Sequence, residues 1–454
     1  MFGIAAEVTM RAAGVAVVGG SIAGCAFATA AARAGADRVV VLERTYGELT
    51  DRGVGLCVHD DRYAELAVAG YLDDSIAWHR LTRRHWLTRD GSPSGRLLWD
   101  QPFPFRSYHW GLLWRGLRER TPASVEYRLG DTVAAVANVP APAANGTDAA
   151  NGSAAKGIPA NGSPANGTEG PAGGTGGASV RLVAGGEERF DLVIGADGYR
   201  SVVRAAVCPE AGPQYAGYVC WRGSFPAERL AELGTPAAEA WPATAAITVC
   251  FPGGQCVLYR IPGPEPGTLM VNWVFYTEPP ATGARSDAPA GIPPGALAAD
   301  LAGRLGQLAE RHLPPYWAEV LALTPPVRTL LQPIHDLDTP RRTRGRLLLA
   351  GDAAAVVRPH NTSGAAKALQ DACAFEAAWR RSAGWSELLA AYERERGEAG
   401  RALVSLGRRL GRAQVEQAPD WTTIDGPQVV AWWNSQVDGA TGFGGQALAA
   451  PPGR

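Results

Sequence analysis

The sequence predicts an α/β fold: a discontinuous Rossmann-type domain with an inserted antiparallel-sheet domain, followed by C-terminal helices. Val15–Val18 is a short apolar run that enters a glycine turn, and an alanine-rich helix then runs to about Arg33. A second apolar run, Arg38–Leu42, completes an order typical of a βαβ unit. Two more short apolar runs, Phe190–Ile194 and Leu347–Leu349, end in turn residues and are expected to extend the same sheet.

The region from about 213 to 335 has a different pattern. Strand-like stretches at Tyr218–Gly223, Ala246–Phe251, Gln255–Ile261 and Leu269–Tyr276 are separated by proline-rich loops, which is typical of an antiparallel sheet. Trp86–Trp99 is expected to add a hairpin to it. The C-terminal third is predicted to be helical to about residue 415. The domain boundaries that follow are 11–85, 110–212 and 336–415 for the Rossmann-type domain, 86–109 and 213–335 for the sheet domain, and 416–454 for an irregular, tryptophan-rich end.

Composition excludes several classes of protein. Lys plus Arg is 43 and Asp plus Glu is 44, a formal net charge of −1, so a generally basic nucleic-acid binder is not expected. The seven cysteines form no C-x-x-C pair, which argues against a disulfide framework and a zinc site. The N-terminal residues lack a leader pattern, and no apolar run reaches about 18 residues. We therefore expect a cytoplasmic protein without a membrane partner.

Residues 137–178 are rich in Ala, Gly, Pro and Asn and contain no aromatic residue. Such a stretch buries too little apolar surface to offset its chain entropy. We expect a disordered insert within the Rossmann-type domain.

The first motif is Gly19-Gly20-Ser21-Ile22-Ala23-Gly24, followed at the end of the second strand by Glu43. The dinucleotide fingerprint is G-x-G-x-x-G with an acid about 20 residues later. Gly19 permits the tight turn, the small Ser21 lets the backbone approach a pyrophosphate, and Gly24 lets the helix pack on the sheet. Glu43 is placed to accept from ribose hydroxyls. The alternative is a glycine-rich turn without a ligand.

Two more motifs place an Asp after a buried strand. Asp197 follows the predicted strand Phe190–Ile194, and Asp352 follows Gly351 after the strand Leu347–Leu349. Each Asp taken alone is equally consistent with a helix N-cap.

The three motifs, in this order and spacing, resemble the FAD-dependent aromatic hydroxylases of the para-hydroxybenzoate hydroxylase type, the class A flavoprotein monooxygenases. The resemblance implies that Asp352 bonds the ribityl chain of FAD and that Asp197 lies near the pyrophosphates of FAD and NAD(P)H. It places Glu43 and Arg44 at the adenosine end and Arg115 on the phosphate side of the flavin.

A narrower likeness is carried by Val357–Ala368, Gly217–Gly223 and Val271–Tyr276, which are similar to the 2,6-dihydroxypyridine 3-hydroxylase branch. The likeness implies that Pro359 and Gly364 belong to the loop that flanks the flavin ring. The backbone amides of Ala365 and Ala366, at the start of a helix, would bind a flavin carbonyl.

The resemblance implies a single-component monooxygenase that hydroxylates a small electron-rich aromatic through an FAD C4a-hydroperoxide, using O₂ and NADH or NADPH. A hydroxypyridine is the preferred substrate, in catabolism or in tailoring a natural product such as an antibiotic. A homodimer is expected by the same resemblance. Nothing in the sequence distinguishes NADH from NADPH.

Substrate deprotonation requires groups that handle a proton near the flavin. His360 stands where relatives carry a small residue, and an imidazole titrates near neutrality, so His360 and Pro359 are the catalytic candidates. Trp221 and Arg222 are expected to stack on and pair with an anionic ring, with Tyr218 and His59 as further substrate contacts. The structural alternatives are a buried hydrogen bond for His360 and, for Trp221 and Arg222, a pair of sheet residues facing an interface or a salt bridge.

Two rival functions remain. One is a flavoenzyme of another reaction type, such as an epoxidase. The other is a non-catalytic protein that binds a flavin or a drug, since the motifs indicate FAD binding better than turnover.

Overall fold

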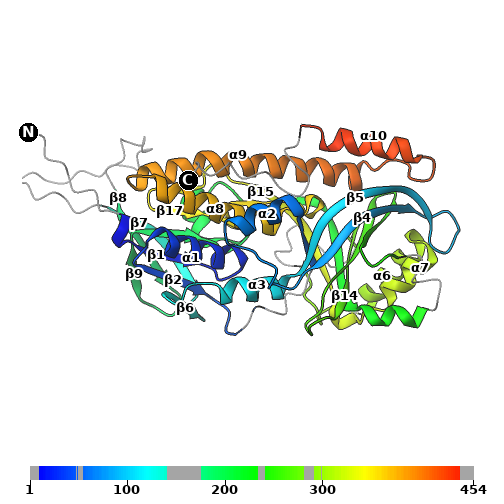
Figure 1. The fold of residues 1–454 in the computed structure, drawn as a ribbon, viewed down its shortest axis with the longest axis horizontal. Coiled ribbons are helices and arrows are strands. Elements are labelled where there is room, and N and C mark those ends of the chain that lie inside the picture. The colour runs from blue at the N-terminus through cyan, green and yellow to red at the C-terminus, as the bar shows by residue number, and fades with distance from the viewer. Residues whose placement is uncertain are drawn as a thin grey trace, which may run out of the picture.

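The computed structural model of the chain describes residues 10–47, 49, 55–140, 175–233, 241–280, 291–297 and 299–439. The molecule is elongated, with one sheet system at each end and a long helix running along both (Figure 1). Of the predicted insert 137–178, residues 141–174 lie outside the described part.

A six-stranded sheet forms the first part, in the order β16-β17-β10-β1-β2-β6. The strands are β1 (Gly14–Val18), β2 (Arg38–Glu43), β6 (Val125–Leu129), β10 (Leu192–Gly195), β16 (Thr343–Arg344) and β17 (Leu347–Leu349). All neighbours are parallel except β16 and β17. The predicted βαβ unit and its two extending strands are confirmed. Phe190 instead ends β9 (Glu187–Phe190), because Asp191 separates this strand from β10.

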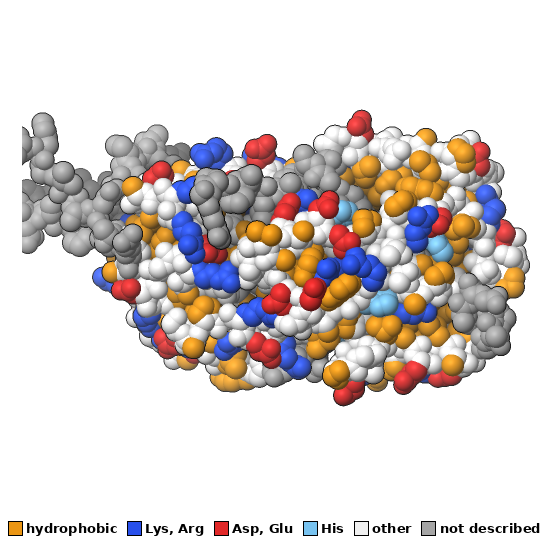
Figure 2. Space-filling model, viewed as in Figure 1, with side chains coloured by type: hydrophobic (Ala, Val, Ile, Leu, Met, Phe, Trp, Pro, Cys, Tyr) orange, Lys and Arg blue, Asp and Glu red, His pale blue; other side chains and the backbone are white. Residues whose placement is uncertain are grey.

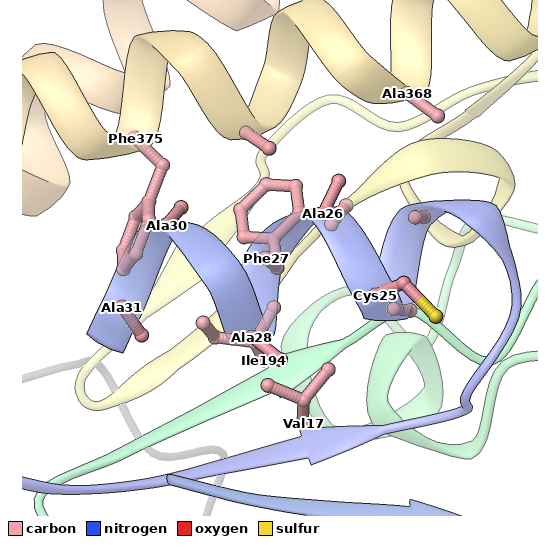
Figure 3. Packing of buried hydrophobic residues seen from close by; sticks show 14 of the residues in the cluster. Val17, Cys25, Ala26, Phe27, Ala28, Ala30, Ala31, Ile194, Ala368 and Phe375 are labelled. Atoms are coloured by element: carbon pink, nitrogen blue, oxygen red, sulfur yellow. The ribbon is translucent and has the colours of Figure 1, made fainter. Parts of the chain in front are cut away.

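Helix α1 (Ile22–Ala34) lies between this sheet and α8 (Gly364–Arg381). Figure 3 shows Val17 and Ile194 of the strands on one side of α1 and Phe375 of α8 on the other. Phe27 packs on Phe375 with ring centroids 5.3 Å apart. Seven of the helix residues are alanines and five of these are buried, and their small size lets one helix pack closely against two layers.

A three-stranded antiparallel sheet is formed by β7 (Val133–Pro140), β8 (Thr175–Leu182) and β9. Ala137 pairs with Ser179 and Val139 with Gly177. The predicted boundaries of the insert are therefore wrong at both ends, since 137–140 and 175–178 belong to paired strands. Ala178 is fully buried, and backbone pairing orders residues that composition alone marks as unstructured.

The second part is a nine-stranded sheet in the order β18-β15-β11-β14-β13-β12-β4-β5-β3. Its strands are β3 (Gly55–His59), β4 (His79–Thr88), β5 (Arg96–His109), β11 (Gln214–Pro226), β12 (Ala245–Phe251), β13 (Gly254–Pro262), β14 (Leu269–Thr277), β15 (Thr329–Asp338) and β18 (Ala355–Val356). All pairs are antiparallel except β4 with β12. The sheet extends into segments that the sequence placed in the Rossmann-type domain, and the division into domains stays a prediction.

One face of this sheet is covered by α6 (Ala299–His312) and α7 (Pro315–Ala322) (Figure 1). Leu308 and Trp317 of these helices join Trp221, Trp273 and other strand residues in one buried cluster. Both helices lie within 213–335, where the sequence indicated only strands and loops.

Shorter helices complete the Rossmann-type part: α2 (Asp60–Val68), α3 (Trp110–Glu119) and α4 (Val202–Val207). The long α9 (Trp385–Gly411) passes into a π-helical turn, Arg412–Glu416, which agrees with the predicted helical end near 415. Among the described residues no helix is both long and apolar enough to cross a bilayer. On the face drawn in Figure 2, basic and acidic side chains are interspersed.

The segment predicted to be irregular after 416 contains α10 (Gly426–Val437), so that prediction is wrong. Asp425 and Gln428 form a reciprocal capping box at its N-terminus. Val429 and Trp433 pack in one buried cluster with Trp86 and Trp421. The Asp-x-x-Gln spacing was a readable N-terminal signal.

Candidate functional site

The turn between β1 and α1 has the geometry of a phosphate-binding turn. Gly19 has a φ of 96°, in the left-handed region that favours glycine, and its N–H donates to Leu42 O at 2.8 Å. A Cβ on Gly24 would lie 1.9 Å from Gly19 O, and one on Gly20 would lie 1.9 Å from the Tyr127 hydroxyl oxygen. Gly19 is therefore required by its backbone conformation, Gly24 by the close approach of the Gly19 backbone, and Gly20 by the Tyr127 side chain.

The N-terminus of α1 has no side-chain cap. Ser21 occupies the N-cap position without accepting a hydrogen bond from the helix, and the first turn, which includes Ile22 and Ala23, carries no acid. The positive end of the helix dipole and its N–H groups remain for an anion. The buried Glu43 accepts from Gly20 N at 2.7 Å and from Thr45 N at 2.9 Å.

Asp197 lies just after β10, beside this turn. Its Oδ2 accepts from Val202 N at 2.7 Å, whereas its buried Oδ1 has no hydrogen-bond partner within the described residues. Burial raises the pKa of this carboxyl. Arg204 in α4 donates to Ala353 O at 3.2 Å and to Tyr199 O, so it ties the Asp197 loop to the loop that carries Asp352.

The loop of Gly351 and Asp352 is fixed by a buried ion network. Gly351 N donates to Asp371 Oδ2 at 3.1 Å, and Gly351 O accepts from Lys367 Nζ at 2.8 Å. Lys367 pairs with Asp371 at 3.1 Å, and Arg396 Nε holds the other carboxylate oxygen at 2.7 Å. The Asp352 side chain is accessible and makes no hydrogen bond or ion pair within the described part of the chain. Partial removal from water by the surrounding protein raises the pKa of its carboxyl.

Helix α8 begins close to this loop and carries Lys367 and Asp371 of the same ion network. Gly364, Ala365 and Ala366 form its first turn, and Ser363 provides no side-chain cap. Thr362, two residues earlier than Gly364, has a φ of 54° and is the single non-glycine residue with positive φ in the described ranges. Such strain concentrates at functional sites.

Arg44 and Arg115 are both exposed, on the segment after β2 and on α3 respectively. Their predicted places beside the cofactor stay predictions.

These residues fit FAD. The uncapped α1 N-terminus suits a pyrophosphate, and Glu43 keeps a lone pair on each oxygen for ribose hydroxyls. Asp352, without a partner, suits a ribityl hydroxyl, and the free amides at the start of α8 suit a flavin carbonyl.

The nine-stranded sheet turns its second face, here called the inner face, toward the Rossmann-type part. It is formed by alternate residues of five central strands: Arg84, Thr248, Gln255, Val257, Tyr259, Asn272, Val274, Tyr276, Cys220 and Arg222. The turn Pro359–Asn361 brings His360 onto this face, where the imidazole lies over Tyr276 with ring centroids 4.4 Å apart.

His360 is the centre of a buried polar cluster. Its Nε2 lies 2.7 Å from the Tyr218 hydroxyl, and its Nδ1 lies 3.2 Å from Gln255 Nε2. Gln255 also donates to Gln414 Oε1. Because Nδ1 faces an amide donor, it accepts, and Nε2 carries the hydrogen that Tyr218 receives. The structure thus brings Tyr218 and His360 together, with the half-buried Pro359 next to His360 in the chain. Their roles in catalysis and substrate binding stay predictions.

The expectation that His360 titrates near neutrality is wrong. Burial, with Arg358 and Arg84 nearby, lowers the pKa of His360 to about 3. The imidazole is therefore neutral across the physiological range and acts through hydrogen bonds. Arg358 is itself neutralised by Asp336 at 2.8 Å and by Glu416 at 3.0 Å.

Trp221 and Arg222 are not brought together, contrary to the prediction that both contact one ring. Successive residues of a strand face opposite sides. Trp221 is fully buried under α6 and α7 with Trp273, whereas Arg222 belongs to the inner face.

His59 is also placed differently from the prediction. It is the N-cap of α2, where its Nδ1 accepts from Asp61 N at 3.1 Å, and its ring packs edge-on against Phe105. This is a structural role.

Sequence reasoning missed Gln255, Gln414, Tyr276 and Arg84 as neighbours of His360. The strand alternation of Gln255 and Tyr276 could have placed both on the polar face. Gln414 comes from the end of α9, which no local pattern connects to this sheet.

Comparison with known proteins gives matches in two regions. Residues 310–406 match a family described as FAD binding domain, and residues 215–332 match one described as FAD binding domain-like. Aurachin C monooxygenase/isomerase of Stigmatella aurantiaca is 29% identical over 54% of this chain and 57% of its own length. 2,6-Dihydroxypyridine 3-monooxygenase of Paenarthrobacter nicotinovorans is 30% identical over 42% of this chain and 49% of its own length. The alignments thus span about half the length of these relatives.

Among solved structures, 2,6-dihydroxypyridine-3-hydroxylase from Arthrobacter nicotinovorans superposes with a TM-score of 0.75 at 21% identity. The superposition covers 99% of this chain and 100% of that one. It confirms the predicted fold class.

Proposed function

We propose that the protein is a flavin-dependent monooxygenase of the class A aromatic hydroxylase type. The proposal is supported by the match of residues 310–406 to the FAD binding domain family and by the likeness of the fold to 2,6-dihydroxypyridine-3-hydroxylase. The proposed substrate is a small electron-rich aromatic, by preference a hydroxypyridine, and the co-substrates are O₂ and NADH or NADPH. Both curated relatives described above are named as monooxygenases. A role in natural-product tailoring, a cytoplasmic location and a homodimer are parts of the same proposal.

One observation carries the proposal. The segment 351–366 contains both the partnerless Asp352 and the uncapped start of α8, and between them it places His360 on the inner face. One segment of sixteen residues, 351–366, therefore carries both the groups suited to a flavin and the histidine of a buried polar cluster suited to a hydroxylated ring.

FAD, when bound, supplies the activation of O₂ that ring hydroxylation requires. The chain's own residues hold the substrate and its proton. Neutral His360 donates from Nε2 to the Tyr218 oxygen, which leaves the Tyr218 O–H to point at a ligand oxygen. Burial also raises the pKa of Tyr218, so its hydroxyl stays protonated. Tyr218 is thus the contact with the ring oxygen, and His360 positions it.

The buried surroundings of this pair exclude water. His360 and Tyr218 are 5% and 2% exposed, and Tyr276 covers the imidazole. Exclusion of water protects reactive species from hydrolysis and strengthens the hydrogen bonds of the cluster.

The test uses the purified holoprotein with a panel of hydroxypyridines and phenols, recording coenzyme oxidation and hydrogen peroxide together. We expect at least one ring compound to accelerate coenzyme oxidation with little peroxide. His360→Ala should retain FAD but divert coenzyme oxidation to peroxide. Slow oxidation that no compound accelerates, fully matched by peroxide, would contradict the proposal and favour a flavin- or drug-binding protein.

A further inference from the structure

Helix α9 changes its geometry where it reaches the inner face. Its last α-helical residue is Gly411, and the π-helical turn Arg412–Glu416 follows. The turn is closed by the N–H of Gln417, which donates to Arg412 O at 2.7 Å. Such turns are rare and frequently lie at functional sites. The change of helix type therefore points to a local requirement at this end of the inner face.

Three successive residues of the turn, Gln414 to Glu416, contact the surroundings of Tyr218. Val415 packs in the buried cluster that contains Tyr218. Glu416 pairs at 3.0 Å with Arg358, whose guanidinium carbon lies 5.5 Å from the centre of the Tyr218 ring. The end of α9 is thus packed directly beside the tyrosine that faces the ligand in the proposed function.

Gln414 fixes the orientation of the Gln255 amide. The Gln255 nitrogen has two hydrogens, and it lies against His360 Nδ1 at 3.2 Å and against Gln414 Oε1. If this amide turned over, its oxygen would face the Gln414 oxygen, and two acceptors cannot share a hydrogen bond. The accepting oxygen of Gln414, 1% exposed, therefore keeps a donor on Nδ1 and the hydrogen of His360 on Nε2.

The tautomer of His360 decides which way the Tyr218 hydroxyl points. Nε2–H donates to the Tyr218 oxygen at 2.7 Å, which directs the hydroxyl hydrogen away from the imidazole. With the hydrogen on Nδ1 instead, Nε2 would accept from Tyr218, and the tyrosine would offer a ligand only an acceptor. Gln414 thus determines whether a ring oxygen meets a donor or an acceptor.

Gly411 is required for space and not for its backbone conformation. Its φ of −60° and ψ of −45° are ordinary α-helical values, and glycine weakens a helix relative to alanine. A Cβ at this position would lie 2.6 Å from the Tyr218 hydroxyl oxygen and 2.9 Å from Arg358 Nη1. Tyr218 is 2% exposed, and Arg358 is held by Asp336 at 2.8 Å, so neither atom has room to withdraw.

We propose that Gln414 and Gly411 are positioning residues that set the direction of the Tyr218 O–H. Gln414 holds the His360 tautomer that directs this hydrogen at a ring oxygen, and Gly411 leaves the hydroxyl the room to point there. The inference rests on the proposed function and deepens it. It makes the end of α9 part of the substrate site, although neither residue needs to touch the ring.

The first experiment reads the tautomer of His360 by NMR in the holoprotein without a ring compound, using isotopically labelled histidine. The two ring nitrogens differ in chemical shift according to which carries the hydrogen, and the His360 signals are those lost in His360→Gln. We expect the hydrogen on Nε2 in the native protein and a mixture of both tautomers in Gln414→Met. Gln417→Met is the matched control, because Gln417 is exposed and should leave the tautomer unchanged.

Two results would overturn the role of Gln414. One is a native protein with the hydrogen on Nδ1, and the other is an unchanged His360 signal in Gln414→Met. If Gln414→Met does not fold, Gln414→Asn decides, because its oxygen is one methylene too short to reach Gln255.

The second experiment tests Gly411 by urea unfolding of the holoprotein in two backgrounds. Gly411→Ala should lower the unfolding midpoint of the native protein, and Tyr218→Phe should remove most of that loss because the crowded oxygen is gone. Gly397→Ala is the matched control in the same helix, since a Cβ there lies no closer than 3.4 Å to its neighbours. Folding of Gly411→Ala only together with Tyr218→Phe would support the role equally. Equal losses in both backgrounds, or no loss in the native protein, would overturn it.

Turnover connects the positioning residues to the proposed reaction. With a ring compound that is hydroxylated, Gln414→Met and Gly411→Ala should each divert more coenzyme oxidation to peroxide. Gln417→Met and Gly397→Ala should match the native protein. Native coupling in Gln414→Met and Gly411→Ala would contradict the positioning role. Absence of any hydroxylated product contradicts the monooxygenase alone, because the tautomer and the unfolding midpoints are measured without turnover.

Discussion

Replacing Lys367 with methionine tests whether the loop before Asp352 is fixed by the buried ion network. Lys367 is 1% exposed, and its Nζ joins Gly351 O at 2.8 Å to Asp371 at 3.1 Å. Lys367→Met removes both contacts at similar side-chain volume. Gly351 O loses its donor, and Asp371 keeps Arg396 and the Gly351 N–H.

The same helix offers a matched comparison. Glu376 and Arg380 form an ion pair with the same i,i+4 spacing at 2.7 Å, but the Arg380 side chain is 57% exposed. Breaking a buried pair by removing one partner costs roughly 3–5 kcal/mol. An exposed helical pair contributes about 0.3–0.5 kcal/mol. Lys367→Met should therefore destabilise the fold several times more than Arg380→Met.

The assay is urea unfolding of both variants as apoprotein, followed by FAD titration of the folded protein. Lys367→Met should lower the free energy of unfolding by roughly 3–5 kcal/mol and weaken FAD binding, because Asp352 follows the loosened Gly351. Arg380→Met should change neither by a measurable amount. Equal stabilities of the two variants, or native FAD affinity in Lys367→Met, would show that the buried ion network does not fix the loop before Asp352.

Three further predictions concern other parts of the molecule. Gly24→Val places side-chain carbon against Gly19 O, where even a Cβ lies at 1.9 Å, so the purified variant should lack the visible absorbance of FAD; a fully loaded yellow protein would disprove this. The pKa of His360 is about 3 when folded against an ordinary 6.5, so below pH 6.5 the unfolded chain binds a proton that the folded chain refuses. The free energy of unfolding should therefore fall by about 1.4 kcal/mol for each unit by which the pH drops between 6.5 and about 3. Unfolding measured against pH should show this extra slope in the native protein and not in His360→Gln. Parallel slopes of the two proteins would rule it out. Trp221→Ala should cost roughly 3–5 kcal/mol in urea unfolding without changing ligand affinity, because Trp221 faces α6 and α7; a tenfold weaker ligand would show that it lines the site.

The elements near the cofactor site were predictable because their signals are local. The glycines at 19 and 24, the apolar strand before them and Glu43 after them are spaced by the geometry of a single βαβ unit. The turns that carry Asp197 and Asp352 were readable for the same reason.

The substrate face was less predictable because it is assembled from distant segments. Residue alternation on a strand separates Trp221 from Arg222, but sequence alone does not say which side is covered by helices. Arg84 reaches the inner face only through the pairing of β4 with β12. The low pKa of His360 results from burial by elements far apart in the chain, which no local pattern contains.

The proposed reaction transfers one atom of O₂ to an aromatic ring. The most direct test supplies isotopically labelled O₂ to the holoprotein with NADH or NADPH and the ring compound that most accelerates coenzyme oxidation, and weighs the product by mass spectrometry. We expect a product heavier by one labelled oxygen atom. A product with unlabelled oxygen, or labelled peroxide beside an unchanged ring, would contradict it.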